Sequence, residues 1–120
     1  MKRRQVLILD DDLDMCTLLA RALGAVCGRM CRTFHSVDEL QSAAGLGECD
    51  TAILDYRLGR GATGLDACRF LRGIGFAGRI VFFTGDAEVL AGRRELEDLG
   101  VLRVFAKPTD IQDLLALVCD

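Results

Sequence analysis

Five short apolar runs alternate along the chain with longer segments in which apolar residues recur every three or four positions. The runs have the length of strands and close on glycine or polar residues. We therefore expect strands over residues 5–10, 30–34, 51–55, 79–84 and 101–106. The run at 51–55 is small or apolar up to its final aspartate, which predicts a strand buried on both faces.

The segments between these strands have the period of helices. Met15, Leu18 and Leu19 share one face of a first helix, which follows the aspartates at 10–12 and runs to about Gly24. A second helix opens with a capping box at residues 36–39 and stops near 45–47. A third follows the glycine-rich loop 59–64 and reaches about 74, a fourth spans 88–99, and a fifth is capped at 109–112 and ends near 118.

Alternation of strands and helices predicts an α/β fold with one parallel sheet and helices on both faces. Right-handed crossovers limit how five such units can wind. The flavodoxin-like order 2-1-3-4-5, a three-layer sandwich with five helices, fits them best. The 120 residues then form one domain, residues 1–120, with no linker or internal repeat.

Composition excludes several classes of partner. Hydrophobic residues make up 51% and charged residues 28%, which is ordinary for a soluble domain. The net charge of −3 leaves no basic face for nucleic acid. No apolar run has the length of a membrane span, and the sequence before the first strand does not form a signal peptide. We expect a cytoplasmic protein with neither a nucleic-acid nor a membrane partner.

The cysteines are scattered singly among apolar neighbours. There are six of them, without a Cys-x-x-Cys spacing or the histidines that would complete a zinc site: Cys16, Cys27, Cys31, Cys49, Cys68 and Cys119. We expect them all to be small reduced core residues.

Polar side chains follow four of the expected strands. The first ends in Asp10, Asp11 and Asp12, and the third, fourth and fifth end in Asp55, Thr84 and Lys107. Because carboxyl ends of parallel strands share one edge of a sheet, these groups meet there. Crowded carboxylates repel one another and need a cation, and an oxygen-only ligand set suits Mg²⁺. A lysine and a hydroxyl beside a metal and a carboxylate favour phosphoryl transfer.

The four motifs in this order resemble the receiver domain of two-component response regulators. They are Leu-Asp10-Asp11-Asp12, Leu-Asp55-Tyr-Arg-Leu, Phe-Phe-Thr84-Gly85 and Phe-Ala-Lys107-Pro108. The resemblance extends over residues 6–118. It implies a signalling phosphoacceptor rather than an enzyme acting on a substrate of its own.

The resemblance also assigns roles. Asp55 would accept a phosphoryl group from a phosphohistidine of a histidine kinase or a histidine phosphotransfer protein. Asp10, Asp11 and Asp55, with the backbone carbonyl of Arg57, would hold Mg²⁺, while Asp12 either joins them or only starts the helix.

Thr84 would bind the new phosphoryl group, and Lys107 would contact it from the other side after a cis peptide bond to Pro108. The fourth helix, the fifth strand and the last helix would form the face for a partner or for a homodimer.

Two features depart from the usual receiver pattern. Val104 occupies a position where many receivers have an aromatic residue, and Phe105 falls on the opposite face of the strand, so activation would pass through the fourth-helix segment alone. Loop 58–64 lacks a proline and resembles the receivers of hybrid sensor kinases. Arg57 and Arg60 in this region either meet an anionic phosphodonor or are solvated charges. Arg57 can also pair with Asp86 across the site, which predicts slow autodephosphorylation.

Two other functions stay open on the sequence. A phosphatase of the haloacid-dehalogenase type would use Asp10 as nucleophile and Asp12 as acid, although Leu13 stands where Thr or Val is usual. A pseudo-receiver would bind a partner without accepting phosphate. The adduct of beryllium trifluoride separates the three, at Asp55, at Asp10 or nowhere.

Overall fold

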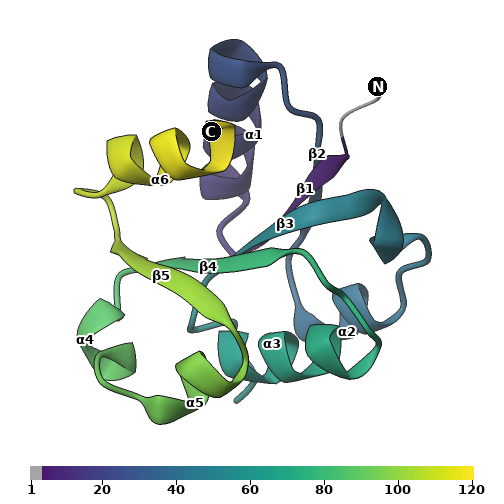
Figure 1. Cartoon of the computed structure of the whole chain (residues 1–120), viewed down its shortest axis with the longest axis vertical. Coiled ribbons are helices and arrows are strands. Elements are labelled where there is room, and N and C mark those ends of the chain that lie inside the picture. Colours follow the sequence, from purple (N-terminus) through teal and green to yellow (C-terminus); the bar gives the residue numbers. More distant parts are fainter. Residues whose placement is uncertain (1–3) are drawn as a thin grey trace.

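A computed structural model describes residues 4–120 as a parallel sheet between two layers of helices (Figure 1). The strands are β1 (Gln5–Leu9), β2 (Cys31–Phe34), β3 (Cys49–Leu54), β4 (Arg79–Thr84) and β5 (Val101–Ala106). Their order is β2-β1-β3-β4-β5, and every neighbouring pair is parallel. The predicted flavodoxin-like order is therefore confirmed.

Helices cover the two faces unequally. The helices are α1 (Leu13–Cys27), α2 (Val37–Gln41), α3 (Gly64–Gly73), α4 (Ala87–Leu90), α5 (Arg94–Asp98) and α6 (Ile111–Cys119), with a 3₁₀ turn, η1 (Leu46–Glu48). In Figure 1, α1 and α6 lie on one face of the sheet and α2, α3, α4 and α5 on the other.

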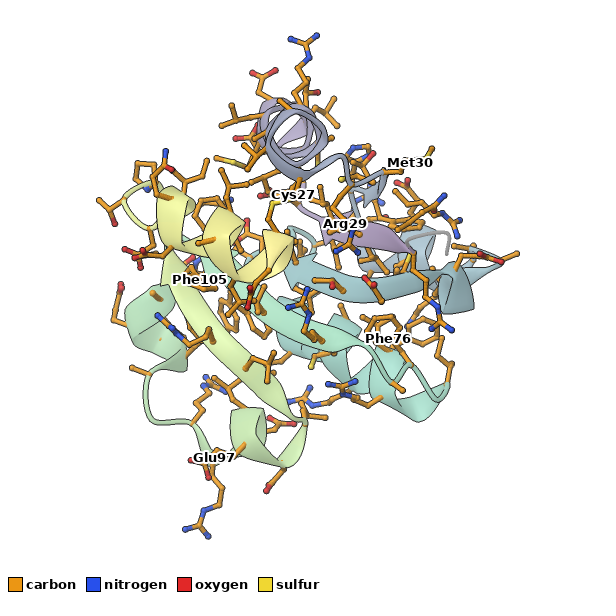
Figure 2. All side chains as sticks on the ribbon, turned by 45° about the horizontal axis from the view of Figure 1, so that its top comes forward. Cys27, Arg29, Met30, Phe76, Glu97 and Phe105 are labelled. Atoms are coloured by element: carbon orange, nitrogen blue, oxygen red, sulfur yellow. A yellow bond between two sulfur atoms is a disulfide. The ribbon has the colours of Figure 1, made fainter. Side chains whose placement is uncertain are left out.

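The alternation of side chains along each strand builds two hydrophobic clusters. Val6 and Ile8 of β1 pack under α1 and α6, whereas Leu7 and Leu9 pack toward the other helices. Figure 2 shows the side chains that fill both layers, with Phe105 on the α6 side. Burial of both faces explains why the strands read as continuous apolar runs.

The prediction of one continuous fourth helix is wrong. The structure breaks 88–99 into α4 and α5, so there are six α-helices in the described chain rather than five. Gly92, between them, has φ +75°, a left-handed conformation that an α-helix does not admit. Two shorter differences concern α1, which continues to Cys27 before the left-handed cap Gly28, and α2, which ends at Gln41.

The prediction that all six cysteines are reduced is also wrong. Cys27 and Cys119 form a disulfide, and Cys16, Cys31, Cys49 and Cys68 are free thiols. The pair is separated by 92 positions, so no local spacing signals it. It depends on the ends of α1 and α6 coming together in the fold.

Within residues 4–120, none of the helices combines the length and the apolar character that crossing a membrane requires.

Candidate functional site

Backbone hydrogen bonds carry the sheet one residue past its strands and fix the aspartates at its carboxyl edge. The amide of Asp10 donates to the carbonyl of Phe34 at 3.0 Å, and that of Asp55 donates to the carbonyl of Leu9 at 2.9 Å. Both residues are buried at this edge, Asp10 being 2% and Asp55 8% exposed, whereas Asp11 is exposed to solvent. Two neighbouring strands thus deliver the three carboxylates from a rigid frame.

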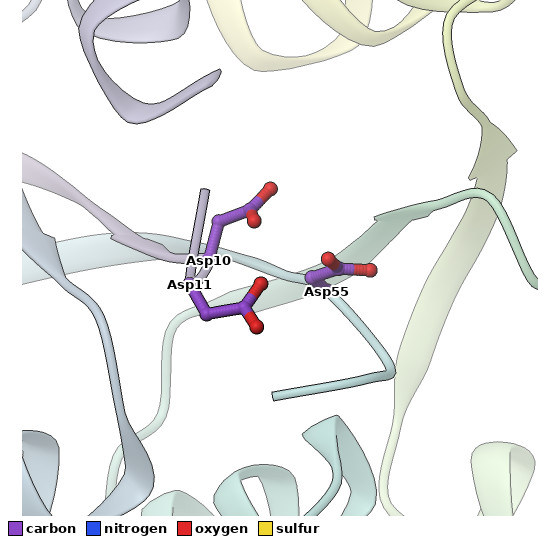
Figure 3. A group of neighbouring side chains, drawn as sticks. All are labelled: Asp10, Asp11 and Asp55. Carbon is purple, nitrogen blue, oxygen red and sulfur yellow. The ribbon is translucent and has the colours of Figure 1, made fainter. Parts of the chain in front are cut away.

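Asp10, Asp11 and Asp55 lie close enough to share a cation. Each offers a carboxylate oxygen, and the three oxygens lie within 4.8 Å of one another (Figure 3). The donors are all oxygens, and the exposed side at Asp11 gives water access to the cluster. This donor set fits Mg²⁺, which takes few carboxylates and keeps several waters. The predicted grouping of these residues is found in the structure, while Mg²⁺ itself stays a prediction.

Lys107 lies between two of the carboxylates. Its Nζ is 2.6 Å from Oδ2 of Asp10 and 3.0 Å from Oδ2 of Asp55, and only 16% of its side chain is exposed. Burial acts to lower the pKa of Lys107, but the hydrogen bonds to both aspartates outweigh it and raise this pKa above the ordinary lysine value. The predicted cis peptide bond to Pro108 is present. Lys107 is therefore a charged ammonium directed at Asp55.

Asp10 is the most buried of the three carboxylates, and its pKa is raised. Burial is the main cause, and the nearby Asp55 charge adds to it, against the hydrogen bonds from Lys107 and from the amide of Asp12. A carboxylate in this setting gains from any further positive charge.

Thr84 completes the edge from β4 and is fully buried. Its hydroxyl oxygen accepts from the amide of Asp86 at 3.2 Å and from the amide of Tyr56 at 3.4 Å. The Tyr56 amide also donates to Oδ1 of Asp55 at 2.8 Å. Since the Thr84 oxygen is the acceptor in both contacts, its hydroxyl proton stays available for donation to a third group.

Asp12 has a structural task. Its Oδ1 accepts from the amides of Asp14 at 3.0 Å and Met15 at 3.2 Å, which makes it the N-cap of α1. Of the two roles considered for Asp12, the structure therefore supports the start of the helix.

Arg57 and Asp86 form the ion pair that their positions predict. Nε of Arg57 lies 2.9 Å from Oδ2 of Asp86, with 70% of the arginine side chain exposed. The backbone of Arg57 forms an isolated antiparallel bridge with Thr63, which closes the glycine-rich loop. Whether its carbonyl binds a metal stays a prediction. Arg60 is exposed on the same loop.

Sequence reasoning missed Gly64, the first residue of α3. A Cβ there would lie 2.1 Å from the carbonyl oxygen of Asp55 and 2.6 Å from the ring of Phe82. The Gly64 amide donates to the Tyr56 carbonyl at 2.7 Å. Absence of a side chain thus lets α3 approach the backbone of the central aspartate. The sequence signal for this close approach is a glycine directly after Thr63, the residue that caps α3.

Val104 and Phe105 of β5 lie on opposite faces of the strand, as the sequence predicts. Phe105 is 1% exposed and packs in the cluster under α1 and α6, whereas Val104 packs on the opposite face. The position that many receivers fill with an aromatic residue is therefore valine in this chain, on the side of α4 and α5.

The fold and this edge define a class of flavodoxin-like domains that carry an acidic cluster and a lysine at the carboxyl edge of the sheet. The chain belongs to the response regulator receiver domain family, whose model matches residues 6–119. It is a receiver domain of a two-component response regulator. Family membership disfavours the phosphatase alternative with Asp10 as nucleophile.

Curated relatives include two proteins named acid tolerance regulatory protein ActR, from Sinorhizobium medicae and Rhizobium meliloti. Each is 34% identical over 113 residues, which is 94% of this chain but 57% of the relative. The chain thus spans little more than half the length of these relatives.

Solved structures share the fold over almost the whole chain. The activated receiver domain of Klebsiella pneumoniae RstA is 26% identical with a TM-score of 0.78, covering 95% of this chain and 94% of that one. A CheY-like receiver domain from Methylobacillus flagellatus is 20% identical with a TM-score of 0.80, covering 98% and 97%. The receiver TrrA of Thermotoga maritima, solved in complex with Mg²⁺ and beryllium fluoride, is 22% identical with a TM-score of 0.78, covering 96% of both chains.

Proposed function

We propose that this receiver domain is a Mg²⁺-dependent phosphoacceptor, phosphorylated on Asp55 by a phosphohistidine of a histidine kinase or a histidine phosphotransfer protein. The observation that carries the proposal is the meeting of Lys107 with Asp55 beside the Asp10 and Asp11 carboxylates. A carboxylate nucleophile, a cation and an acidic metal cluster are the parts that phosphoryl transfer needs.

In the transfer, a carboxylate oxygen of Asp55 attacks the phosphorus, and the bond from phosphorus to the histidine nitrogen breaks. The product is an acyl phosphate on Asp55. The contacts on Asp55 orient it for this attack, because the Tyr56 amide holds Oδ1 and Lys107 holds Oδ2. Alignment of a nucleophile on rigid strands supplies part of the rate.

Lys107 and Thr84 then bind oxygens of the acyl phosphate that the transfer forms. An acyl phosphate extends beyond Asp55 and presents three oxygens, so the ammonium of Lys107 can move from the carboxylates to one of them. The Thr84 hydroxyl lies beside the Tyr56 amide, next to Asp55, and can donate to another. This exchange of partners between β4 and β5 is the physical basis for a switch in partner binding.

Asp10, Asp11 and Asp55, with the Arg57 carbonyl, would hold Mg²⁺. When bound, the ion neutralises charge that develops on the transferring phosphoryl group. The chain itself holds the carboxylates within reach of one another and buries Asp10 away from solvent.

Beryllium trifluoride with Mg²⁺ tests the site directly, since it forms a phosphoryl-like adduct on a carboxylate. We expect one adduct, at Asp55, seen by ¹⁹F NMR, and none in Asp55→Asn. An adduct at Asp10 would instead support the phosphatase, and no adduct would support a pseudo-receiver. Asp12→Asn is a matched control, because Asp12 is an aspartate of the same edge that caps α1; it should keep the adduct.

Transfer from a panel of phosphorylated histidine kinases would identify the partner. Labelling of the natural chain and not of Asp55→Asn is the expected result. A cytoplasmic location stays a prediction. The same holds for attachment to a hybrid sensor kinase.

A homodimer would use the face formed by α4, α5, β5 and α6. Leu102 on β5 is a large apolar side chain that is 52% exposed there. Sedimentation with and without beryllium trifluoride tests this: a dimer that Leu102→Asp abolishes supports the face, and an unchanged monomer excludes it.

A further inference from the structure

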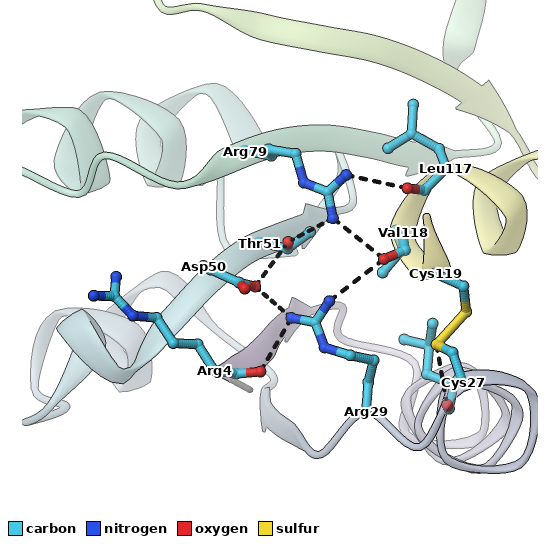
Figure 4. The surroundings of a disulfide bond; sticks show 10 residues. Arg4, Cys27, Arg29, Asp50, Thr51, Arg79, Leu117, Val118 and Cys119 are labelled. Carbon is cyan, nitrogen blue, oxygen red and sulfur yellow. Dashed lines mark hydrogen bonds and ion pairs between the residues drawn. A yellow bond between two sulfur atoms is a disulfide. The ribbon is translucent and has the colours of Figure 1, made fainter. Parts of the chain in front are cut away.

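The disulfide lies away from the carboxylate edge, at the far ends of two helices that start there. Cys27 is the last residue of α1 and Cys119 is the last residue of α6. Their Cα atoms are 5.5 Å apart, a normal separation for a bonded pair. Figure 2 shows Cys27 where the end of α1 approaches α6, and Figure 4 shows the bond itself.

The other thiols of the described chain are poorly suited to redox chemistry. Burial raises the pKa of Cys16, Cys31 and Cys68 to about 11 and raises the pKa of Cys49 as well. Since the thiolate is the reactive form, these four react slowly near neutral pH. Cys27 and Cys119 are both only half-buried, so neither residue is enclosed in the core.

Both ends of the bond have partners that would persist without it. Sγ of Cys27 lies 3.4 Å from the carbonyl oxygen of Leu23, which gives a reduced thiol an acceptor one turn back in α1. The end of α6 is held separately, because Arg29 and Arg79 both donate to the carbonyl oxygen of Val118, at 3.4 and 3.2 Å (Figure 4). The fold can therefore keep its shape in the reduced form.

We propose that Cys27 and Cys119 form a reversible thiol–disulfide couple, a modification site that exchanges with small thiols and disulfides of the glutathione class. In oxidation, one cysteine thiolate attacks a sulfur of the small disulfide and expels a thiolate, which leaves a mixed disulfide. The second cysteine thiolate then displaces the remaining small thiolate. Two cysteine thiols are oxidised, one small disulfide is reduced to two thiols, and their protons balance.

The couple changes the stability of the domain and the freedom of the α1–α6 pair. A bond across 92 positions closes a loop that contains β2, β3, β4 and β5, whereas β1 lies outside it. Such a closure restricts the unfolded chain strongly. Because α1 starts after Asp11 and α6 starts after Lys107, the two tethered helices are those that follow the site on β1 and β5.

The first measurement uses the natural chain and needs no phosphorylation. The protein is equilibrated with oxidised glutathione or with dithiothreitol, alkylated under native conditions and mapped by mass spectrometry. We expect a Cys27–Cys119 cross-linked peptide after oxidation and alkylation of both residues after reduction. We expect Tm to fall by roughly 10 °C or more on reduction. A failure to form the cross-link, or a bond that dithiothreitol leaves intact in the folded protein, would overturn the proposal.

Variants separate this couple from the other thiols. Cys119→Ser and Cys27→Ser should remove the dependence of Tm on redox state. Cys31→Ser is the matched control, since Cys31 is also a half-buried cysteine but a free thiol, and it should keep the full shift. An equal shift in Cys119→Ser would contradict the proposal. If one serine variant fails to fold, the other variant and the mass-spectrometric mapping of the natural chain still test the proposal.

Discussion

The two edges of the sheet both hold charged groups in poorly solvated surroundings, but the partners of these groups differ between the edges. At the amino edge, Arg29 is 4% exposed and donates to the carbonyls of Arg4 and Val118 and to the Asp50 carboxylate. Arg79 donates to Thr51 and to the last carbonyls of α6. Guanidinium groups at the carboxyl end of a helix also complement its dipole.

At the carboxyl edge the charges do not balance within the chain. Lys107 contacts Asp10 and Asp55, and Asp11 lies beside them, so three carboxylates face one ammonium. The amino edge is thus arranged for stability, since the terminal nitrogens of both guanidinium groups have acceptors in place, although Nε of Arg29 has none within residues 4–120. The carboxyl edge retains excess negative charge, which the proposed metal ion would neutralise. This contrast predicts that variants at one edge lower stability alone, while variants at the other change metal binding and phosphoryl transfer.

The largest effect should come from Gly64→Ala, which attacks the frame of the carboxylate edge. The added Cβ would overlap the Asp55 carbonyl at 2.1 Å, so the start of α3 must shift. We expect a loss of about 3 kcal/mol or more in the free energy of unfolding, measured in urea. Adduct formation at Asp55 should weaken as well.

Gly73→Ala is the control on the same helix. A Cβ at Gly73 meets no described atom within 4 Å, so this change should be neutral or slightly stabilising. Equal losses in the two variants would show that the close approach at Gly64 has no special importance.

Arg29→Met tests the amino edge. It removes the hydrogen bonds to two carbonyls and to Asp50, and we expect it to cost about 2 to 3 kcal/mol of stability. Transfer to Asp55 by the protein that stays folded should be unchanged. Arg93→Met, at an exposed arginine bonded to the Val89 carbonyl, should change stability by no more than about 0.5 kcal/mol. Loss of phosphotransfer in folded Arg29→Met would contradict the claim that variants at the amino edge affect stability alone.

Lys107→Met tests the carboxylate edge. It removes the ammonium that competes with a metal for Asp10 and Asp55, so Mg²⁺ should bind several-fold more tightly, as measured by calorimetric titration. Phosphotransfer should slow by about tenfold, equivalent to about 1.4 kcal/mol, because the acyl phosphate loses a charged donor. Lys107→Arg keeps the charge and should retain more activity than the methionine variant. Weaker Mg²⁺ binding in Lys107→Met would contradict the competition between the two cations.

Much of the fold and the edge could be predicted because both depend on local patterns and one topological rule. The apolar runs predict where the strands lie. A parallel sheet then brings Asp10, Asp55, Thr84 and Lys107 to one edge, whatever the exact bounds of the helices are. Even the pairing of Arg57 with Asp86 follows, since each lies two residues beyond a site residue.

The remainder depends on distances between segments that the sequence does not link. Cys27 meets Cys119 only after α1 and α6 have packed, and no spacing indicates it. Arg29, between a glycine and a methionine, gives no sign that it is buried. Glycine permits many backbone conformations, so the sequence does not show that Gly92 adopts a left-handed one two residues after the end of α4, where the chain turns into α5.

The smallest effect concerns the pair over the site, where Arg57→Ala should shorten the lifetime of the acyl phosphate. We expect the pair to restrict the approach of a hydrolytic water to the acyl phosphate, so its loss should ease that approach. Because Arg57 is 70% exposed, the change in stability should stay below about 1 kcal/mol, and the lifetime should fall only a few-fold. Decay of labelled protein after removal of the kinase measures it. Arg60→Ala removes the same charge from the same exposed loop, so a lifetime that is unchanged in Arg57→Ala, or equally short in both variants, would show that the pair does not restrict water.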